Sequence, residues 1–297
     1  MPQPLQDLPW RALDREALEF HFNPRVSVPD FARYDQERTG LNEAALAECS
    51  PWLDIPYGDH PLHSLDIYPA QPGGGGEEGA VHVFFHGGYW RALDKANFAF
   101  IGGALAERGI TTVIPNYELC PASTLDEVVA SARAAFAWIC ANIHRYGASR
   151  DKISLSGHSA GAHLSAAILS ADWSGDPSIP SALTGVLLVS GVFDPSPAMM
   201  TSLNDDLRLS REMADRNNME NCTPRLKAPV TLVAGALEPA HWQDMTVRYA
   251  EQLRRAGYAQ VDMHMLPGCH HFNILDGYLD EHGIMRKAIP GAAGDPS

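Results

Sequence analysis

Two short glycine-containing motifs carry the residues of this chain that could perform nucleophilic chemistry. Residues 157–161 read GHSAG, and residues 86–90 read HGGYW. Each motif follows a short apolar segment, residues 153–155 and 81–85 respectively, which predicts a buried strand. A serine on a sharp turn from strand to helix needs small residues two positions before and after it, because the backbones there approach closely. We therefore expect Ser159 to be a nucleophile that projects from the edge of a sheet.

The alternative role of Ser159 is that of an ordinary cap at the start of a helix. Residues 160–171 read AGAHLSAAILSA, a segment of small residues with Leu and Ile that predicts a helix. Strand, serine and helix thus follow one another in the order that a nucleophile on a turn requires. This context favours the catalytic role.

A serine nucleophile also needs backbone N–H groups aimed at the negative charge that develops on the substrate oxygen. We expect Gly88 and Ala160, the residue after the nucleophile, to supply them, with Gly87 as a further donor. Glycine at positions 87 and 88 lets the backbone approach a ligand closely. These three residues are the predicted oxyanion hole.

The residues beside these glycines are candidates for the wall of a substrate pocket. Tyr89 and Trp90 are expected there together with His158, which precedes the serine. A packing role is the alternative for the aromatic pair. His86 is expected to brace its loop by hydrogen bonding and not to transfer protons.

The serine further requires a base to take its proton and an acidic partner to orient that base. On a strand-turn-helix serine these follow in the order serine, acid, histidine. Residues 229–235 predict a buried strand, and Glu238 lies just beyond its last glycine. Asp194, after the preceding strand, and Asp244, expected on the following helix and pointing to solvent, are the competing acids. Glu238 is preferred.

The base is expected after the next strand, which we predict at residues 261–266. His270 and His271 follow it directly. We favour His271, because Phe272 and Ile274 indicate the start of a packed helix that would anchor it. A surface imidazole is the alternative for either histidine.

The elements that position these residues follow from alternating strand and helix patterns. The alternation predicts an α/β fold with a mostly parallel sheet, helices on both faces and right-handed crossovers. Residues 54–58 and 65–68 predict an antiparallel hairpin at the sheet edge. A Thr-x-x-Glu capping box opens a predicted helix over residues 124–145. Strands of the parallel part are expected near residues 81–85, 111–115, 152–156, 185–192, 229–235 and 261–266.

The chain is expected to form one large domain with peripheral segments. Residues 1–50 are polar and proline-containing and predict an N-terminal arm that packs on the core. Residues 51–290 form the domain, interrupted near residues 195–224 by a segment without strand signal that predicts a small helical cap over the site. Residues 291–297 predict a frayed tail.

Composition narrows the expected partners. The formal net charge of −14 at pH 7 argues against nucleic acid and anionic membranes. Apolar stretches are shorter than a membrane span, and the first residues lack a signal-peptide pattern, so a cytoplasmic protein is expected. The five scattered cysteines predict reduced thiols; Cys269, beside the candidate histidines, is expected to be a small gap-filler, with a reactive thiol as the alternative. We expect a small-molecule substrate, and a homodimer is compatible with the sequence.

The 13 histidines raise the question of a metal site. None shows a His-x-x-x-His spacing on a predicted helix with a glutamate between. His82 and His86 lie on a predicted strand, where positions four apart are too distant to chelate one ion easily. Phosphate-binding and dinucleotide-binding glycine motifs are absent from the sequence. We therefore expect neither a catalytic metal nor a cofactor.

The chain resembles the kynurenine formamidase (arylformamidase) branch of the α/β-hydrolases, which is related to the hormone-sensitive-lipase-like esterases. The resemblance implies the α/β-hydrolase fold, with Ser159 as nucleophile, His271 as base and Glu238 as acid, where the family usually has aspartate. It spans nearly the whole chain and is carried by residues 23–25, 53–58, 86–90, 157–164, 171–173, 188–194 and 271–272.

The implied activity is cleavage of an aryl formamide such as N-formyl-L-kynurenine to formate and the free arylamine, through a formyl-serine intermediate. The alternative is a carboxylesterase or amidase that acts on small acyl or aryl substrates. A third reading is a receptor that uses the hydrolase fold to bind a ligand without turnover. Such receptors usually lack a triad member, whereas all three positions are filled here.

Overall fold

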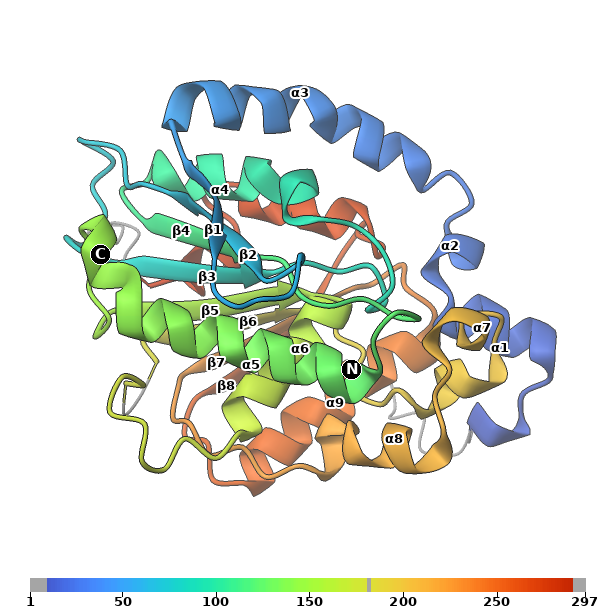
Figure 1. Cartoon of the computed structure of the whole chain (residues 1–297). Helices are drawn as coiled ribbons and strands as arrows, with labels where there is room; N and C mark the ends of the chain where they lie inside the picture. Colours follow the sequence, from blue (N-terminus) through green and yellow to red (C-terminus); the bar gives the residue numbers. More distant parts are fainter. Residues whose placement is uncertain (1–9, 181–182, 291–297) are drawn as a thin grey trace.

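A twisted eight-stranded sheet runs through the computed structural model, which describes residues 10–180 and 183–290 (Figure 1). The spatial order is β1-β2-β4-β3-β5-β6-β7-β8. The first two strands pair antiparallel, as do β2 and β4, and all other neighbours are parallel. The predicted mostly parallel sheet with an antiparallel edge hairpin is confirmed. The strands are β1 (Trp52–Pro56), β2 (Ser64–Tyr68), β3 (Val81–Phe85), β4 (Thr111–Pro115), β5 (Ile153–His158), β6 (Gly185–Val189), β7 (Val230–Gly235) and β8 (Val261–Leu266).

The central strands are buried on both faces, which explains their near-continuous apolar sequences. Adjacent side chains of β3 point to opposite faces, so Val83 and Phe85 join one core cluster and Phe84 the other. The prediction that β6 continues to residue 192 is wrong. The strand ends at Val189, because Ser190 adopts a left-handed backbone with φ of 48°.

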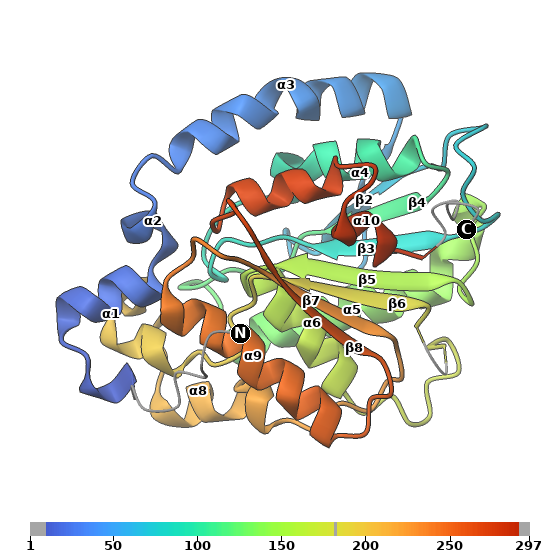
Figure 2. The ribbon, with the colours of Figure 1, turned by 180° about the vertical axis from the view of Figure 1, so that it is seen from behind.

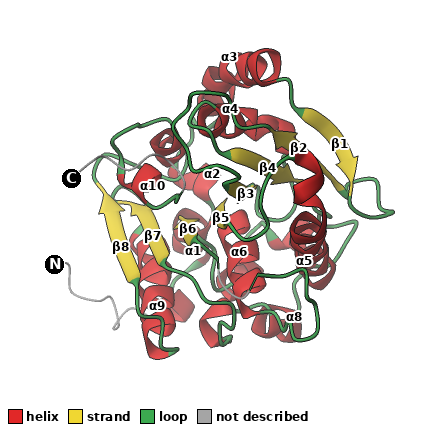
Figure 3. Cartoon of the chain, turned by 90° about the vertical axis from the view of Figure 1, so that its left-hand side faces the viewer, coloured by secondary structure: helices red, strands yellow, loops and turns green. Residues whose placement is uncertain are grey.

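Helices cover both faces of the sheet, as the strand–helix alternation predicts (Figures 1 and 2). On one face lie α3 (Ala32–Cys49), α4 (Ala99–Ala106) and the short α10 (Ile284–Lys287). On the other lie α5 (Leu125–Asn142), α6 (Ala160–Ser170) and α9 (Ala240–Arg255). Seen after a quarter turn in Figure 3, the sheet lies between these two layers.

The predicted capping box is present at the start of α5. The Thr124 side chain accepts from the N–H of Glu127, and the Glu127 carboxylate accepts from the N–H of Thr124. This pairing satisfies two N–H groups that a helix start leaves free. The predicted helix over residues 124–145 is therefore observed, although its last turn is the 3-10 helix η3 (Ile143–Tyr146).

The N-terminal segment forms a helical arm around one side of the domain (Figure 1). It contains η1 (Trp10–Ala12), α1 (Arg15–Phe22), α2 (Pro24–Ser27) and α3. The arm is held by close packing of α3 on α4, where a Cβ added to Gly103 would lie 2.7 Å from the Cβ of Ala45. This contact brings α2 and the start of α3 to the carboxyl edge of the sheet.

Four short helical elements follow β6, and the second of them lies beside α1 (Figure 1). They are η4 (Ser196–Met200), α7 (Asn204–Leu207), α8 (Arg211–Arg216) and η5 (Met219–Asn221). Two further 3-10 helices, η2 (Lys95–Phe98) and η6 (Asn273–Tyr278), flank the edge where the strands end. The expected tail at residues 291–297 lies outside the described residues. Among the helices of the described residues, none is both long and apolar enough to span a membrane.

Candidate active site

Ser159 lies on the sharp turn between β5 and α6 and adopts φ of 57° and ψ of −117°. A Cβ on Gly157 would lie 2.2 Å from the carbonyl carbon of Gly161, and one on Gly161 would lie 1.9 Å from the carbonyl oxygen of Phe85. Both distances are far below van der Waals contact, so only glycine fits at these positions. The turn is fastened by the N–H of Ser159, which donates to the carbonyl of Val189 at 2.8 Å.

A chain of hydrogen bonds runs from this serine to a buried carboxylate. The Ser159 hydroxyl donates to Nε2 of His271 at 3.0 Å, and Nδ1 of His271 donates to Oε1 of Glu238 at 2.7 Å. Each of the three residues is at most 5% exposed. They come from loops after β5, β7 and β8, which meet at the carboxyl edge of the parallel sheet (Figure 1). The structure thus brings together the three sequence-predicted residues.

Burial sets the charge states that this chain of hydrogen bonds can adopt. It lowers the pKa of His271, which favours a neutral imidazole that can accept the serine proton. Burial also raises the pKa of Glu238, while hydrogen bonds from the N–H of Gly235 and the hydroxyl of Ser190 favour its carboxylate. Both donors bind Oε2 at 2.8 Å, which leaves Oε1 for the imidazole.

Ser190 is a site residue to which sequence reasoning gave no role. Its segment was part of the family resemblance, but a serine after a strand carries no local signal for contact with an acid 48 positions away. Its carbonyl accepts from Nε1 of Trp242 at 3.0 Å, and the Trp242 ring packs edge-on against His271 at 4.7 Å. Ser190 and Trp242 therefore support Glu238 and His271 together.

The competing acids have other partners. Oδ1 of Asp194 accepts from the N–H of Ser196 at 2.9 Å and so stabilises the turn into η4. The expectation that Asp244 points to solvent is wrong, because its side chain is only 12% exposed and pairs with Arg248. Arg248 also pairs with Glu220 at 2.8 Å, which ties α9 to η5 and covers Asp244.

The neighbouring histidine His270 faces away from the serine. Its Nε2 lies 2.7 Å from the hydroxyl of Tyr34, and its Nδ1 accepts from the N–H of Phe272 at 3.1 Å. His270 therefore joins the strand-edge loop to the N-terminal arm. The expected helix after His271 is the 3-10 helix η6, anchored by the fully buried Ile274.

The predicted oxyanion donors lie close to the serine: Gly88 lines the same cavity as Ser159, and Ala160 follows it in the chain. In the part of the chain that the structure describes, the N–H groups of Gly87, Gly88 and Ala160 donate no hydrogen bond to the protein. A Cβ on Gly87 would lie 3.3 Å from the Cβ of Ser159, so this glycine approaches Ser159 directly. Gly88 has φ of 114°, where an added Cβ would meet the Ala92 carbonyl oxygen at 2.1 Å. These N–H groups are free to bind a ligand oxygen.

The predicted pocket-wall residues divide into two groups. His158 and Tyr89 line a cavity next to Ser159. His158 also donates from Nε2 to the carbonyl of His271 at 2.8 Å, which fixes the backbone of that histidine. The prediction that Trp90 lines the pocket is wrong. Its side chain is fully buried and packs against His163, with ring centroids 4.9 Å apart, behind the residues that line the cavity.

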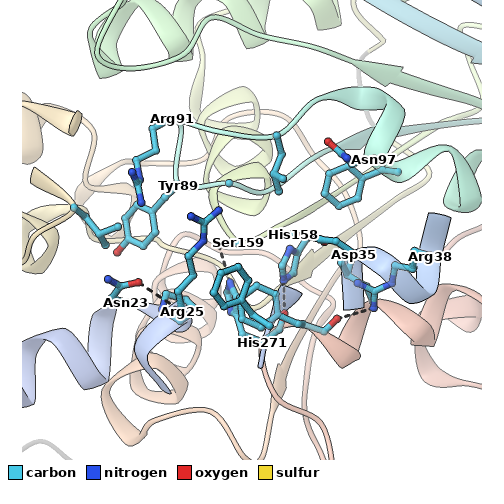
Figure 4. Close-up of a pocket in the computed structure, with 18 residues that line it drawn as sticks. Asn23, Arg25, Asp35, Arg38, Tyr89, Arg91, Asn97, His158, Ser159 and His271 are labelled. Atoms are coloured by element: carbon cyan, nitrogen blue, oxygen red, sulfur yellow. Dashed lines mark hydrogen bonds between the residues drawn. The ribbon is translucent and has the colours of Figure 1, made fainter. Parts of the chain in front are cut away.

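The cavity beside Ser159 encloses about 740 Å³, including the open space at its mouth, and is drawn in Figure 4. Ser159 and His271 lie near its centre in that view, with residues of α2 and α3 on either side. Its lining includes the aromatic side chains of Phe31, Tyr89, Phe98 and Phe272. The N-terminal arm contributes Asn23, Pro24, Arg25, Phe31, Asp35 and Arg38.

The contribution of the arm was missed by sequence reasoning, which placed a helical cap near residues 195–224 over the site. That segment is helical, but Leu203 is its sole residue in the cavity lining. The arm lies in the better position because its close packing on α4 carries α2 across the carboxyl edge. No local pattern in residues 1–50 encodes that long-range contact.

A cluster of possible metal ligands and the thiol of Cys269 both lie outside the cavity beside Ser159. His60, His63 and Glu118 bring three ligand atoms within 4.8 Å of one another, but none of them lines the cavity. Nε2 of His63 already pairs with Glu118 at 2.9 Å. Cys269 carries a thiol whose pKa is raised by burial, so it stays protonated near neutral pH.

The fold and the site define the class of protein. The family model described as the alpha/beta hydrolase fold matches residues 82–274, and the chain belongs to this family. It is a hydrolase. Kynurenine formamidase from Danio rerio is 27% identical over 291 residues, which cover 94% of this chain and 97% of that protein. Kynurenine formamidase from Salmo salar is 28% identical over 284 residues, or 91% and 94% of the two chains.

A solved structure shares the fold at lower sequence similarity. It is assigned as a thioesterase from Silicibacter sp. tm1040 and superposes with a TM-score of 0.78 at 24% identity. The match covers 91% of this chain and 98% of that one. The α/β-hydrolase fold and the resemblance to kynurenine formamidases are therefore confirmed.

Proposed function

We propose that this hydrolase cleaves an aryl formamide, such as N-formyl-L-kynurenine, to formate and the free arylamine. The observation that carries the proposal is the hydrogen-bonded series Ser159–His271–Glu238 at the wall of a cavity with aromatic lining. The full-length similarity to kynurenine formamidases supports a formamide as the scissile group. Ser159 is the nucleophile, His271 the general base and acid, and Glu238 the orienting acid.

The first step forms a formyl-serine intermediate. As Nε2 of His271 takes the hydroxyl proton, Oγ of Ser159 attacks the formyl carbon. The carbonyl oxygen becomes an oxyanion, which the N–H groups of Gly88 and Ala160 stabilise, with Gly87 as a further donor. Glu238 stabilises the imidazolium through Nδ1.

The second part of the reaction releases both products. The imidazolium of His271 gives its proton to the departing arylamine nitrogen, a step that amide cleavage requires more than ester cleavage does. The C–N bond breaks and the formyl group stays on Ser159. Water then attacks this ester while His271 accepts its proton, and formate leaves as Oγ regains a hydrogen.

The cavity lining agrees with an aromatic leaving group. Phe31 and Phe272 stack with ring centroids 5.6 Å apart, and Phe98 and Tyr89 add further aromatic surface. Aromatic rings bury large areas and favour offset or edge contacts with another ring. An aryl formamide places such a ring beside its scissile bond.

The test compares kcat/KM for N-formyl-L-kynurenine and p-nitrophenyl acetate, with the Ser159→Ala variant as the blank. We expect a clear preference for the formamide and only residual turnover by the variant. Turnover of the ester alone would move the function to the second candidate, a carboxylesterase or an amidase for another substrate. The same serine chemistry supports that candidate, because an ester leaving group needs less protonation.

A fluorophosphonate probe tests turnover chemistry without a choice of substrate. We expect it to label Ser159 in the native protein and not in Ser159→Ala. Absence of labelling in the native protein would favour a receptor that binds without catalysis.

A further inference from the structure

Three arginines line the cavity, and they differ in whether their charge is already paired. Arg38 donates to the Asp276 carboxylate at 2.7 Å and to the carbonyl of Phe272 at 2.8 Å. Arg91 pairs with Asp206. Within residues 10–180 and 183–290, the guanidinium of Arg25 forms no ion pair. Arg25 is therefore the cavity cation that is free to bind an anion.

The structure holds Arg25 in place both at its backbone and at its guanidinium. Pro24 opens the short helix α2, and Oδ1 of Asn23 accepts from the backbone N–H of Arg25 at 3.3 Å. Its guanidinium carbon lies 4.9 Å from the centre of the Phe31 ring, within the range of a cation–π contact. Figure 4 shows Arg25 reaching from α2 toward Ser159.

Other charges do not supply an anion for this cation. Asp35 carries the one carboxylate among the described lining residues, and within residues 10–180 and 183–290 it forms no ion pair with Arg25. The net charge of −14 gives the protein as a whole no attraction for an anion. A ligand carboxylate that enters this cavity therefore depends on a local cation.

We propose that Arg25 binds the α-carboxylate of an amino-acid substrate whose formamide lies at Ser159. This inference rests on the proposed function and names its substrate class: aryl formamides that carry an amino-acid side chain. The planar guanidinium fork matches a carboxylate with two parallel hydrogen bonds. The aromatic lining beside it lowers the local dielectric and strengthens that contact.

The substitution that tests the proposal is Arg25→Gln, with Arg15→Gln as the matched control. Arg15 lies on the same arm, is exposed and is not part of the cavity lining. Two substrates are compared: N-formyl-L-kynurenine and 2-formamidoacetophenone, which keeps the aryl formamide but lacks the amino-acid group. Steady-state kinetics give KM and kcat for each pair.

We expect Arg25→Gln to raise KM for N-formyl-L-kynurenine by about tenfold or more, the range of a bidentate ion pair at a partly open site. The KM for 2-formamidoacetophenone should stay within about twofold, since no carboxylate is present. The KM of Arg25→Lys for N-formyl-L-kynurenine should lie between those of the unmodified protein and Arg25→Gln, because the lysine keeps the charge but loses the planar pair of donors. Arg15→Gln should match the unmodified protein on both substrates.

Two results would overturn the assignment: an equal loss on both substrates, which indicates a structural role of Arg25, or no change on either. Failure of the proposed function is recognised separately, as absence of turnover of both formamides by the unmodified protein. Calorimetry with Ser159→Ala then compares L-kynurenine with 2-aminoacetophenone. Tighter binding of L-kynurenine that is lost on adding Arg25→Gln supports carboxylate recognition, and equal binding of the two ligands refutes it.

Discussion

The hydroxyl of Ser190 donates to Oε2 of Glu238 at 2.8 Å, while Ser190 itself adopts a left-handed backbone with φ of 48°. This backbone turns the chain out of β6 directly behind the acid. The second oxygen of a buried carboxylate needs its own donors, because an unsatisfied charged group is costly in the interior. Ser190 and the N–H of Gly235 meet that need and fix the direction of Oε1.

Replacement of Ser190 should loosen the orientation of the Glu238 carboxylate. Ser190→Gly removes the hydroxyl and tolerates the left-handed backbone, so the loss of the hydrogen bond is isolated from strain. A hydrogen bond to a charged group contributes about 1.5–3 kcal/mol, and we expect kcat to fall roughly 10- to 100-fold. Steady-state kinetics and the melting temperature measure the effect. An unchanged kcat would show that Gly235 alone suffices to orient Glu238.

The two adjacent histidines should differ sharply. His271→Ala removes the proposed base, which contacts Ser159, and should reduce kcat nearly as much as Ser159→Ala, because residues that act as a unit give non-additive losses. His270→Ala removes the contacts with Tyr34 and with the N–H of Phe272, none of which reaches Ser159, and should retain most of kcat. The comparison is made by single-turnover kinetics. A larger loss for His270→Ala would reverse the assignment of the base.

The pH dependence of kcat/KM should follow the protonation of the hydrogen-bonded pair Glu238 and His271. The active form has a carboxylate and a neutral imidazole, so uptake of one proton by the pair abolishes activity. Burial raises the pKa of Glu238 to about 7, and activity should be full above that pH and fall as the pH drops through it. In Glu238→Gln only the imidazole titrates, and its pKa is lowered by burial.

In the pH profile of Glu238→Gln, the acidic limb of kcat/KM should therefore move to lower pH. The maximum value of kcat/KM should fall, because the imidazolium loses its anionic partner. Profiles are recorded under identical salt conditions for both proteins. A limb that stays in place in Glu238→Gln would indicate that a group outside the pair controls the acidic side.

The glycine two positions after Ser159 should tolerate no side chain. Gly161→Ala places a Cβ 1.9 Å from the carbonyl oxygen of Phe85, between two backbones that cannot move apart, and we expect a loss of more than about 3 kcal/mol of stability. Gly40→Ala is the matched control. Position 40 is exposed within α3, with no atom within 4 Å of an added Cβ. The change should therefore increase the free energy of unfolding by about 0.5–1 kcal/mol.

Chemical denaturation of the two glycine variants decides the comparison. Equal stability of Gly161→Ala and the unmodified protein would mean that the turn relaxes. In that event, the close approach at this turn would not be the reason for its glycine.

Local sequence determined much of this protein. Apolar strand segments, the capping box of α5 and the GHSAG turn follow from short-range sterics and hydrogen bonding, which neighbouring residues alone specify. Parallel strands bring the three residues together, because their carboxyl ends meet at one edge, and the strand-turn-helix serine sets the expected order serine, acid, histidine. Ser159, Glu238 and His271 could therefore be nominated from the residues themselves.

The tertiary structure decided what covers and supports that site. Ser190, Trp242 and Arg25 reach it through contacts between segments far apart in the chain, and no local pattern encodes such contacts. Trp90 turned into the core and β6 ended before residue 192 for the same reason: packing against His163 and the left-handed backbone of Ser190 override local preference. Side-chain direction and partner choice depend on the packed neighbourhood, which exists only after the sheet has assembled.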